Sequence, residues 1–373
     1  MPSRVAIVGI GYTPIRPASP SQSFKEMMFE AARRAYADAG IDFREVGSFV
    51  TCAEDLNESL LIFDEYTPDQ LGAVLKPMHT LPQDGLHGIA DGVMQILAGL
   101  TDLVVVEAHS KASNIVTPDW VVDYALDPVW NRPLGMNPHV IAALEMNAFL
   151  NEAAFSKDTC GDVVAKNKTN ALGNPVAAYP ANIDGRAVDE SPYRFYPLRE
   201  LDIARNADGC AVVVLASEGR ARKIAHAPIW IDGVGFANGS PTLESRDWVR
   251  ADYVTTAARM AYRQAKITRP SKELDILEID DTYSYKELQH LLALELLGDN
   301  EAPSQDIPIN ISGGAIGMGY TLEATGLYRI VELVLQLRGQ AGARQVKNAK
   351  RGLAQSWRGV PTTSSAVVVL RAD

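Results

Sequence analysis

The sequence carries RVAIVGIGYT at residues 4–13, and PIWIDGVGFA at residues 228–237 repeats this pattern at an offset of 224. Both stretches are rich in residues that favour strands, and both contain glycines near the end. A segment typical of a helix follows each, AARRAY at residues 31–36 and AARMAY at residues 257–262, at an offset of 226. Because the order of these segments is kept, the sequence predicts an internal duplication.

Further apolar stretches follow both helices. SFVTCAED lies around Val50 and ILEIDDTY around Ile279, and the two halves close with the stretches CAVVVLAS and SAVVVLRA. Strands with continuous Val, Ile and Leu that alternate with helices indicate sheets covered on both faces. We therefore expect an α/β fold of two similar domains, residues 1–225 and 226–373. Residues 110–201, rich in Pro, Asn, Trp and Tyr, have no counterpart in the second half and are expected to form a functional loop insertion.

The composition is that of an ordinary globular protein. Of the 373 residues, 47% are hydrophobic and 22% charged, and the formal net charge is -11. This negative charge opposes binding to nucleic acid, although a local patch of Arg and Lys can still bind the phosphates of coenzyme A. The sequence contains neither a run of about 18 apolar residues nor a signal-peptide pattern, so no membrane association is expected.

The three cysteines, Cys52, Cys160 and Cys210, are odd in number and widely spaced. This spacing favours reduced thiols in the cytoplasm over a disulfide framework, and the absence of a CxxC pair argues against a zinc site. His79 and His87 lack a third ligand at metal spacing. We expect a cytoplasmic protein without a bound metal.

Three local patterns resemble the thiolase superfamily, and with the duplication the resemblance covers nearly the whole chain. GLHGIADGVMQILAGLTDLVVVEAHSKAS (85–113) resembles the helix that follows a thiolase nucleophile and leads into the next strand. NISGGAIGMGYTLEATGL (310–327) is similar to the family's glycine loop N-x-x-G-G-A-I-x-x-G-H-P-x-G-x-x-G. EIDDTYS (278–284) matches the strand end that reads NEAF or HDCF in relatives. The resemblance implies two domains in αβαβα layers and a homodimer formed through the first-half sheets.

The nucleophilic cysteine of a thiolase has no equivalent here. Its aligned position falls at Pro82, and no cysteine lies between Cys52 and Cys160. Thiolysis needs this thiolate because it both attacks the substrate and leaves the acyl-enzyme. Tyr320 replaces the histidine that would activate it, and the motif at 353–364, which often supplies a second cysteine, has none. A classical thiolase reaction is therefore not expected.

Tyrosine and aspartate side chains remain as candidates for acid–base chemistry. A tyrosine can deprotonate or protonate a hydroxyl group once its pKa, normally about 10, is adjusted by its surroundings. The pattern resembles that of thiolase-like retro-aldolases that shorten steroid side chains, which implies catalytic roles for Tyr320 and Tyr283, with Tyr285 as an alternative to Tyr283. Asp281 or Asp280 would orient a tyrosine or a water.

Asp84 lies beside the position of the missing nucleophile. It is interpreted either as a second acid or base or as the N-cap of the helix that starts near Leu86. The resemblance also implies a set of residues that contact the CoA thioester, namely Asn310, Gly313, Gly314, Gly319, His139 and Ser356. Asn310 or the backbone of the glycine loop would face the thioester oxygen. For His139 a surface or capping role is an equal alternative.

The leading hypothesis is a lyase that cleaves a β-hydroxyacyl-CoA by a retro-aldol reaction, with the CoA thioester as substrate and no covalently bound cofactor. The resemblance further implies a small zinc-ribbon/OB-fold partner protein. Two alternatives remain: a catalytically silent scaffold subunit of an acyl-CoA-processing complex, and an acyltransferase without the usual cysteine. In the latter, Ser356 or Ser312 would need an adjacent base. The strands around Ala53 and after Gly99 are the expected edges in a dimer.

Overall fold

The computed structural model describes residues 4–54, 62–115, 123–153, 155–224, 227–240, 242–297, 307–359 and 363–373. Its main element is a mixed sheet of nine strands in the order β3-β2-β4-β7-β1-β8-β11-β10-β9. The strands are β1 (Val5–Tyr12), β2 (Ser48–Cys52), β3 (Met78–Leu81), β4 (Leu103–Lys111), β7 (Asp208–Ser217), β8 (Ile229–Asn238), β9 (Ile276–Glu278), β10 (Arg351–Gly359) and β11 (Thr363–Arg371). A separate hairpin consists of β5 (Tyr193–Phe195) and β6 (Leu198–Arg199).

Each repeat builds its part of the sheet in the same order. From the junction outward, β1, β7, β4 and β2 of the first repeat correspond to β8, β11, β10 and β9 of the second. The two parts join where Val5–Ile7 pairs antiparallel with Ile229–Ile231. The pairs β2–β3, β2–β4 and β9–β10 are parallel, and the remaining pairs are antiparallel. The duplicated α/β fold is thus confirmed. The domain boundary between residues 225 and 226 lies outside the described residues and stays a prediction.

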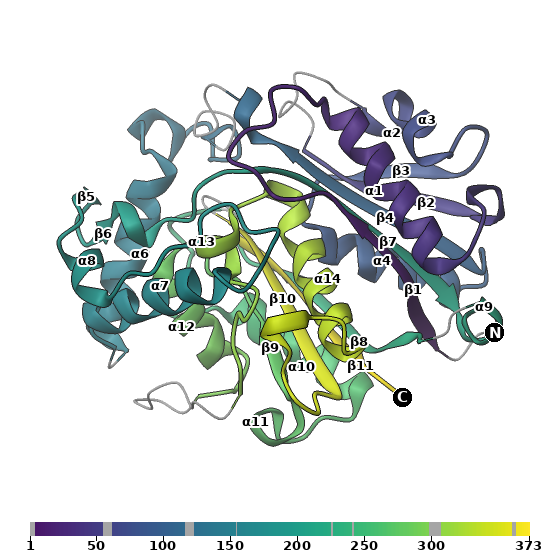
Figure 1. Ribbon diagram of the computed structural model, residues 1–373. Coiled ribbons are helices and arrows are strands. Elements are labelled where there is room, and N and C mark those ends of the chain that lie inside the picture. Colours follow the sequence, from purple (N-terminus) through teal and green to yellow (C-terminus); the bar gives the residue numbers. More distant parts are fainter. Residues whose placement is uncertain are drawn as a thin grey trace.

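Helices cover the sheet and also fill the space between its two parts (Figure 1). They are α1 (Phe24–Ala39), α2 (Phe63–Tyr66), α3 (Pro68–Leu71), α4 (Gly85–Leu97), α6 (Pro138–Glu152), α7 (Lys157–Ala171), α8 (Gly185–Asp189), α9 (Glu218–Ile224), α10 (Asp252–Ala265), α11 (Pro270–Glu273), α12 (Ser284–Ala293), α13 (Gly314–Met318) and α14 (Thr325–Leu337). α1 and α10 pack on the outer faces, and α4 and α14 pack against each other in the central layer. This arrangement is the predicted αβαβα layering.

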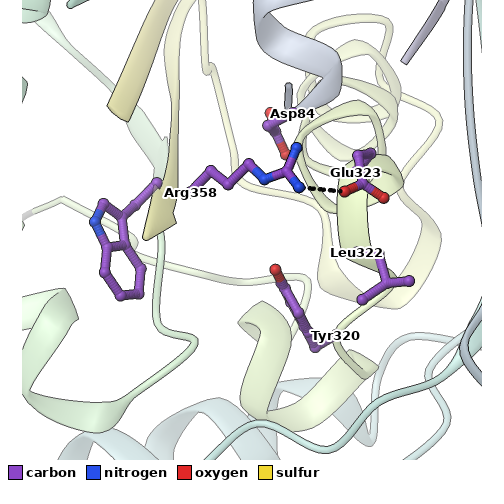
Figure 2. Close-up of a pocket in the computed structure, with 6 residues that line it drawn as sticks. Asp84, Tyr320, Leu322, Glu323 and Arg358 are labelled. Atoms are coloured by element: carbon purple, nitrogen blue, oxygen red, sulfur yellow. Dashed lines mark ion pairs between the residues drawn. The ribbon is translucent and has the colours of Figure 1, made fainter. Parts of the chain in front are cut away.

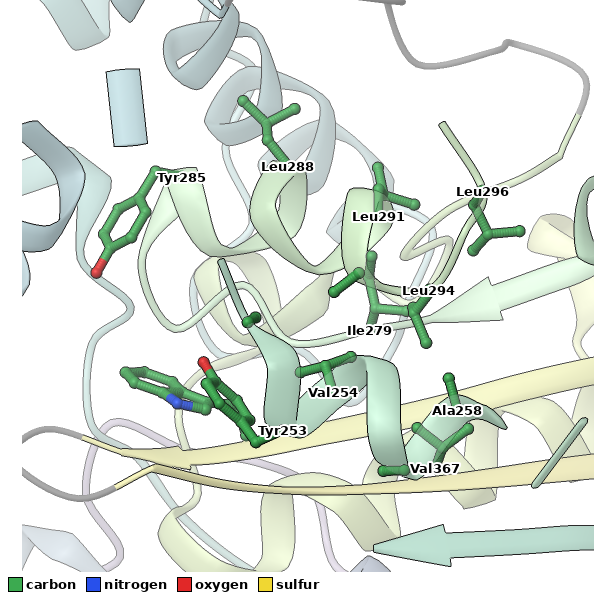
Figure 3. Packing of buried hydrophobic residues seen from close by; sticks show 14 of the residues in the cluster. Tyr253, Val254, Ala258, Ile279, Tyr285, Leu288, Leu291, Leu294, Leu296 and Val367 are labelled. Carbon is green, nitrogen blue, oxygen red and sulfur yellow. The ribbon is translucent and has the colours of Figure 1, made fainter. Parts of the chain in front are cut away.

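The strands alternate between the layers, as a period of two requires. In β4, Val104 and Val106 belong to the central hydrophobic core, whereas Leu103 and Val105 belong to the core under α1. A further core lies on the outer side of the second repeat, where α10, α12 and β11 meet (Figure 3). The continuous apolar strands of the sequence therefore reflect burial on both faces.

Two contacts between glycine and alanine explain why the repeated motifs are alike. A Cβ atom on Gly11 would lie 2.0 Å from the carbonyl oxygen of Ala31, and one on Gly235 would lie 2.0 Å from that of Ala257. Only glycine allows α1 and α10 to approach their strands this closely. The glycine-containing strands and the alanine-rich helices are thus the two sides of one recurring helix–strand contact.

The insertion at residues 110–201 carries α6, α7, α8 and the β5–β6 hairpin. Within it, α7 packs against α12 and α13 of the second repeat. The loop of the first repeat therefore covers the glycine-rich segment of the second, as Figure 1 shows at the left of the molecule.

The prediction of the sheet edges was wrong. β2 and β4 lie inside the sheet, because the short strand β3 pairs with β2 and forms the edge instead. All four residues of β3, Met78–Leu81, are half-buried. Among the described residues no helix is long and apolar enough to span a bilayer.

Candidate functional site

A small pocket lies where the central helices of the two repeats meet. It encloses about 170 Å³, part of it open to solvent, and is lined by Asp84, Tyr320, Leu322, Glu323, Trp357 and Arg358. Figure 2 shows the polar ends of Asp84, Tyr320, Glu323 and Arg358 turned toward the same space. The pocket thus unites two predicted residues, Asp84 and Tyr320, with two charged residues that the sequence analysis did not single out.

Asp84 caps α4, which is one of the two roles considered for it, and it also lines the pocket. Its carboxylate accepts a hydrogen bond from the backbone N–H of Leu86 at 2.8 Å and from that of Gly326 at 2.9 Å. Burial raises the pKa of Asp84, while the positive charge of Arg329 and the backbone hydrogen bonds oppose the rise. A carboxyl group with a raised pKa in a pocket is suited to proton transfer.

Tyr320 points its hydroxyl group into the pocket, toward the guanidinium of Arg358 (Figure 2). Its backbone N–H donates to the carbonyl of Arg205 at 2.8 Å, which anchors the residue at the end of the glycine loop. Desolvation by the surrounding protein raises the pKa of Tyr320, as does the charge of Glu323, and Arg358 lowers it. Near neutral pH the phenol therefore keeps its proton and is suited to donate it.

Glu323 and Arg358 are the functional candidates that sequence reasoning missed. The side chain of Arg358 lies 3.2 Å from Glu323, and burial raises the pKa of this glutamate. The sequence did hold a signal for Glu323, since it stands where the glycine loop of the resembling family has its glycine after H-P-x. Arg358 had no such signal, because its contacts come from distant parts of the chain.

Tyr283 forms a second polar pair next to the pocket. Its hydroxyl group lies 3.0 Å from Nδ1 of His139, and its ring packs edge-on against Trp357 with the centroids 6.1 Å apart. Trp357 is itself one of the residues that line the pocket. Tyr285 instead donates to Glu145 at 3.2 Å in the interior. The structure thus brings His139 and Tyr283 together, next to a tryptophan that lines the same pocket as Tyr320.

Asp281 and Asn310 do not line the pocket, and their contacts are structural. The Asp281 carboxylate accepts hydrogen bonds from the backbone N–H groups of Ala315 and Ile316, at the start of α13. Burial raises its pKa to about 7, against the opposing charge of Arg329. The Asn310 side chain accepts from the N–H of Ile279 and donates to Glu287. Its amide is therefore committed to holding the loop rather than open to a thioester oxygen.

Close packing explains why the loop carries glycines at these positions. Cβ atoms on Gly313, Gly314 and Gly319 would lie 2.6 Å from Ala171, 2.1 Å from Asp281 and 2.8 Å from Ala207, and all three glycines have positive φ. Their N–H groups donate to loop acceptors, namely the carbonyl of Asn310, the hydroxyl of Ser312 and the carbonyl of Ala315. These N–H groups are therefore not free to form the predicted oxyanion hole.

Ser356 and the cysteines do not supply a nucleophile to this pocket. The hydroxyl group of Ser356 is buried and lowers the pKa of Asp84, but it forms no hydrogen bond of regular geometry. Cys52, Cys160 and Cys210 are all buried, and burial raises the pKa of each thiol. No thiol contributes to the lining of the pocket within the described part of the chain. The same part holds no cluster of three or more potential metal ligands.

Comparisons with known proteins agree with the fold. Residues 235–372 match the family model of the thiolase C-terminal domain-like proteins. An acetyl-CoA acetyltransferase of Methanothermobacter thermautotrophicus is 28% identical in an alignment of 388 positions, which covers 98% of this chain and 99% of that protein. The bovine sterol carrier protein 2 is 27% identical over 94% of this chain and 69% of its own length.

Solved structures extend the similarity to three dimensions. The Ltp2-ChsH2(DUF35) aldolase superposes with a TM-score of 0.85 at 22% identity, over 100% of this chain and 98% of that chain. A monomeric SCP2-thiolase-like protein of Mycobacterium smegmatis gives a TM-score of 0.77 at 17% identity, over 100% of this chain and 78% of that chain. The family model over residues 235–372, the relatives that align over nearly the full length and the shared αβαβα architecture all make this chain similar to proteins of the thiolase superfamily.

Proposed function

We propose that the protein is a carbon–carbon lyase that cleaves a β-hydroxyacyl-CoA by a retro-aldol reaction, with Tyr and Asp side chains in place of Cys and His. The observation that carries the proposal is the pocket itself. Tyr320 and Asp84 share it at the start of α4, whereas the three cysteines are buried elsewhere. The relatives include an acetyltransferase and an aldolase, which supports an enzyme of the same broad kind.

The proposed reaction removes one proton from the β-hydroxyl group of the substrate and adds one proton to its Cα atom. Tyr283, whose phenol can pass its proton to His139, accepts the proton of the β-hydroxyl group. The hydroxyl oxygen then forms a carbonyl, the bond between Cα and Cβ breaks, and the electron pair moves onto the thioester as an enolate. Tyr320 donates a proton to Cα, and Asp84 is a further acid or base beside it. The products are a carbonyl compound and a shorter acyl-CoA, and no oxidant or reductant is needed.

The binding roles proposed for the remaining residues follow from their positions. His139 is proposed to contact the pantetheine arm from the inserted loop, while Asn310, Asp281 and the loop glycines support Tyr320 by fixing the loop that carries it. Ser356 is proposed to adjust Asp84 rather than to bind substrate. We further propose a cytoplasmic homodimer that pairs through the edge strand β3, together with a small zinc-ribbon/OB-fold partner. The partner is suggested by the DUF35 component named with the similar aldolase.

A scaffold function is the second candidate, and one observation favours it. The side chains that line the pocket leave it closely filled, so a substrate must widen it. An acyltransferase has less support, because Ser312 is buried and donates its hydroxyl to Glu278. Titration with coenzyme A separates the first two candidates, since a scaffold with a closed pocket binds none.

The decisive experiment offers a panel of β-hydroxyacyl-CoA esters to the purified protein, alone and with its partner, and measures release of a carbonyl compound. The lyase releases aldehyde or ketone from at least one ester. Tyr320→Phe, which removes only the hydroxyl group, abolishes this release. Full activity of that variant, or no release from any ester, removes the proposal.

A further inference from the structure

We propose that Arg358 is the positioning residue that makes Tyr320 an effective proton donor, because it holds positive charge beside the phenolate that remains after the proton has left. The inference deepens the retro-aldol function proposed above and rests on it. Arg358 itself touches neither the reacting carbon nor the leaving proton. It acts through Tyr320.

The position of Arg358 is fixed from both repeats. Its Nη1 atom donates to the carbonyl of Pro82 at 2.7 Å, and its Nη2 atom pairs with the carboxylate of Glu54. Both acceptors come from the first repeat. From the second repeat, Glu323 lies 3.2 Å from the same Nη2 atom. A planar guanidinium held by acceptors on several sides keeps one orientation, which a lysine ammonium could not do.

The charges that face Tyr320 are otherwise negative. They come from Glu323 after the glycine loop, Asp84 at the start of α4 and Asp280 after β9, and all three oppose ionisation of the phenol. Arg358 from β10 is the positive charge among the groups that shift the pKa of Tyr320. Without it, the phenolate would form among carboxylates in a desolvated pocket, where like charges interact strongly.

His87 on α4 also faces Arg358 but cannot substitute for its charge. Burial and the positive charge of the neighbouring Arg358 together lower the pKa of His87 to about 4, so the imidazole is neutral near pH 7. The carboxylate of Glu54 at the end of β2 adds negative charge on the far side of Arg358. The guanidinium of Arg358 is therefore the positive charge that offsets the carboxylates near Tyr320 when the phenol ionises.

The proton step is complete without a co-reactant. The O–H bond of Tyr320 breaks, its electron pair stays on the phenolate oxygen, and the proton forms a C–H bond at Cα of the enolate. The Tyr283–His139 pair then releases one proton to solvent, and the phenolate of Tyr320 takes up one proton from solvent, so that both tyrosines return to their starting state. The charge of Arg358 stabilises the phenolate of Tyr320 that exists between the two proton transfers, and the charge of Glu323 destabilises it.

The test measures ionisation of residue 320 directly in the full-length chain. Tyr320 is replaced by 3,5-difluorotyrosine, whose ring ionises at lower pH, and fluorine NMR follows the titration. We expect Arg358→Met to raise the midpoint by about one pH unit or more and Glu323→Gln to lower it by a similar amount. Arg358→Lys, which keeps the charge but loses the planar fork, gives an intermediate value. Because no turnover is needed, failure here is distinguishable from failure of the lyase function.

A matched control lies on the same strand. Arg351, at the other end of β10, pairs with Asp232 and Glu273, and Arg351→Met leaves the midpoint unchanged. The proposal is overturned if Arg358→Met does not move the midpoint, or if the Arg358 and Glu323 variants move it in the same direction. Should Arg358→Met fail to fold, Arg358→Lys and Glu323→Gln decide: an unchanged midpoint in Glu323→Gln rejects the proposal, and a lowered one supports it.

Discussion

The carboxylate of Asp84 accepts a hydrogen bond from the backbone N–H of Gly326 at 2.9 Å, although 242 positions separate the two residues. Asp84 caps α4, and Gly326 lies in the first turn of α14, so the bond joins the central helices of the two repeats. A Cβ atom on Gly326 would lie 2.0 Å from the carboxylate, which leaves glycine as the residue that permits the contact.

Substitution of Asp84 should therefore cost both stability and activity. Asp84→Asn keeps one acceptor and leaves one buried N–H without a partner, which costs about 1–3 kcal/mol. Asp84→Ala removes the cap as well and costs about 1 kcal/mol more. Urea unfolding followed by circular dichroism measures both values. If Asp84→Ala unfolds at the same urea concentration as the unaltered protein, the bond does not hold the two helices together.

Paired tyrosine variants separate a chemical role from a structural one. Tyr283→Phe removes the hydroxyl group next to His139 and should lower the rate of carbonyl release about 10²- to 10⁴-fold. Tyr285→Phe removes a buried hydrogen bond to Glu145, so it should cost about 1 kcal/mol of stability and leave the rate nearly unchanged. Steady-state kinetics and thermal unfolding of both variants test this. A large rate loss in Tyr285→Phe alone would assign the catalytic role to Tyr285 instead of Tyr283.

The buried carboxyl group of Asp281 should make stability depend on pH. Its folded-state pKa is raised to about 7 by burial, above the ordinary value of 3.8, so the folded protein binds its proton more tightly than the unfolded chain. The stabilisation is fully present below pH 4 and is lost as the pH rises toward 7, by up to about 4 kcal/mol.

Asp281→Asn cannot titrate and removes this term. The free energy of unfolding is measured for both proteins between pH 4 and pH 8, and their difference should change along this range in favour of the variant at the upper end. A difference that stays constant with pH would mean that the carboxyl group titrates alike in both states.

The helix–strand contact of each repeat is sensitive to a single methyl group. Gly11→Ala and Gly235→Ala each place a Cβ atom against a helix carbonyl, and we expect a loss of about 1–3 kcal/mol for either. Gly219→Ala on α9 is the control, because a Cβ atom there meets nothing within 4 Å. It should be neutral or slightly stabilising. Chemical denaturation of the three variants decides the matter, and an equal effect in all three would reject the packing explanation.

The fold could be predicted from the sequence because its causes are local and repeated. The glycines at 9–11 and 233–235 and the alanines opposite them recur together, and the long apolar strands need cover on both faces. The cap at Asp84 could also be predicted, since its residue type and place before a helix have a local meaning. The edge strand could not, because the four residues of β3 carry no distinctive pattern.

The candidate site was only partly predictable. Tyr320 stood out by its departure from a motif, but the motif gave no means to see that Asn310 and Asp281 hold the loop together from within. Arg358 was missed because its significance lies in partners more than 200 positions away, at Glu54 and Pro82. Contacts of this kind exist only once the two repeats are packed.

Because Asp84 comes from one repeat and Tyr320 from the other, neither half holds the complete pocket. If the chain is cut between the halves, the proposed lyase activity should be absent from the separate fragments and should return only when they reassociate. Split-chain complementation would then turn assembly of the molecule into a catalytic signal.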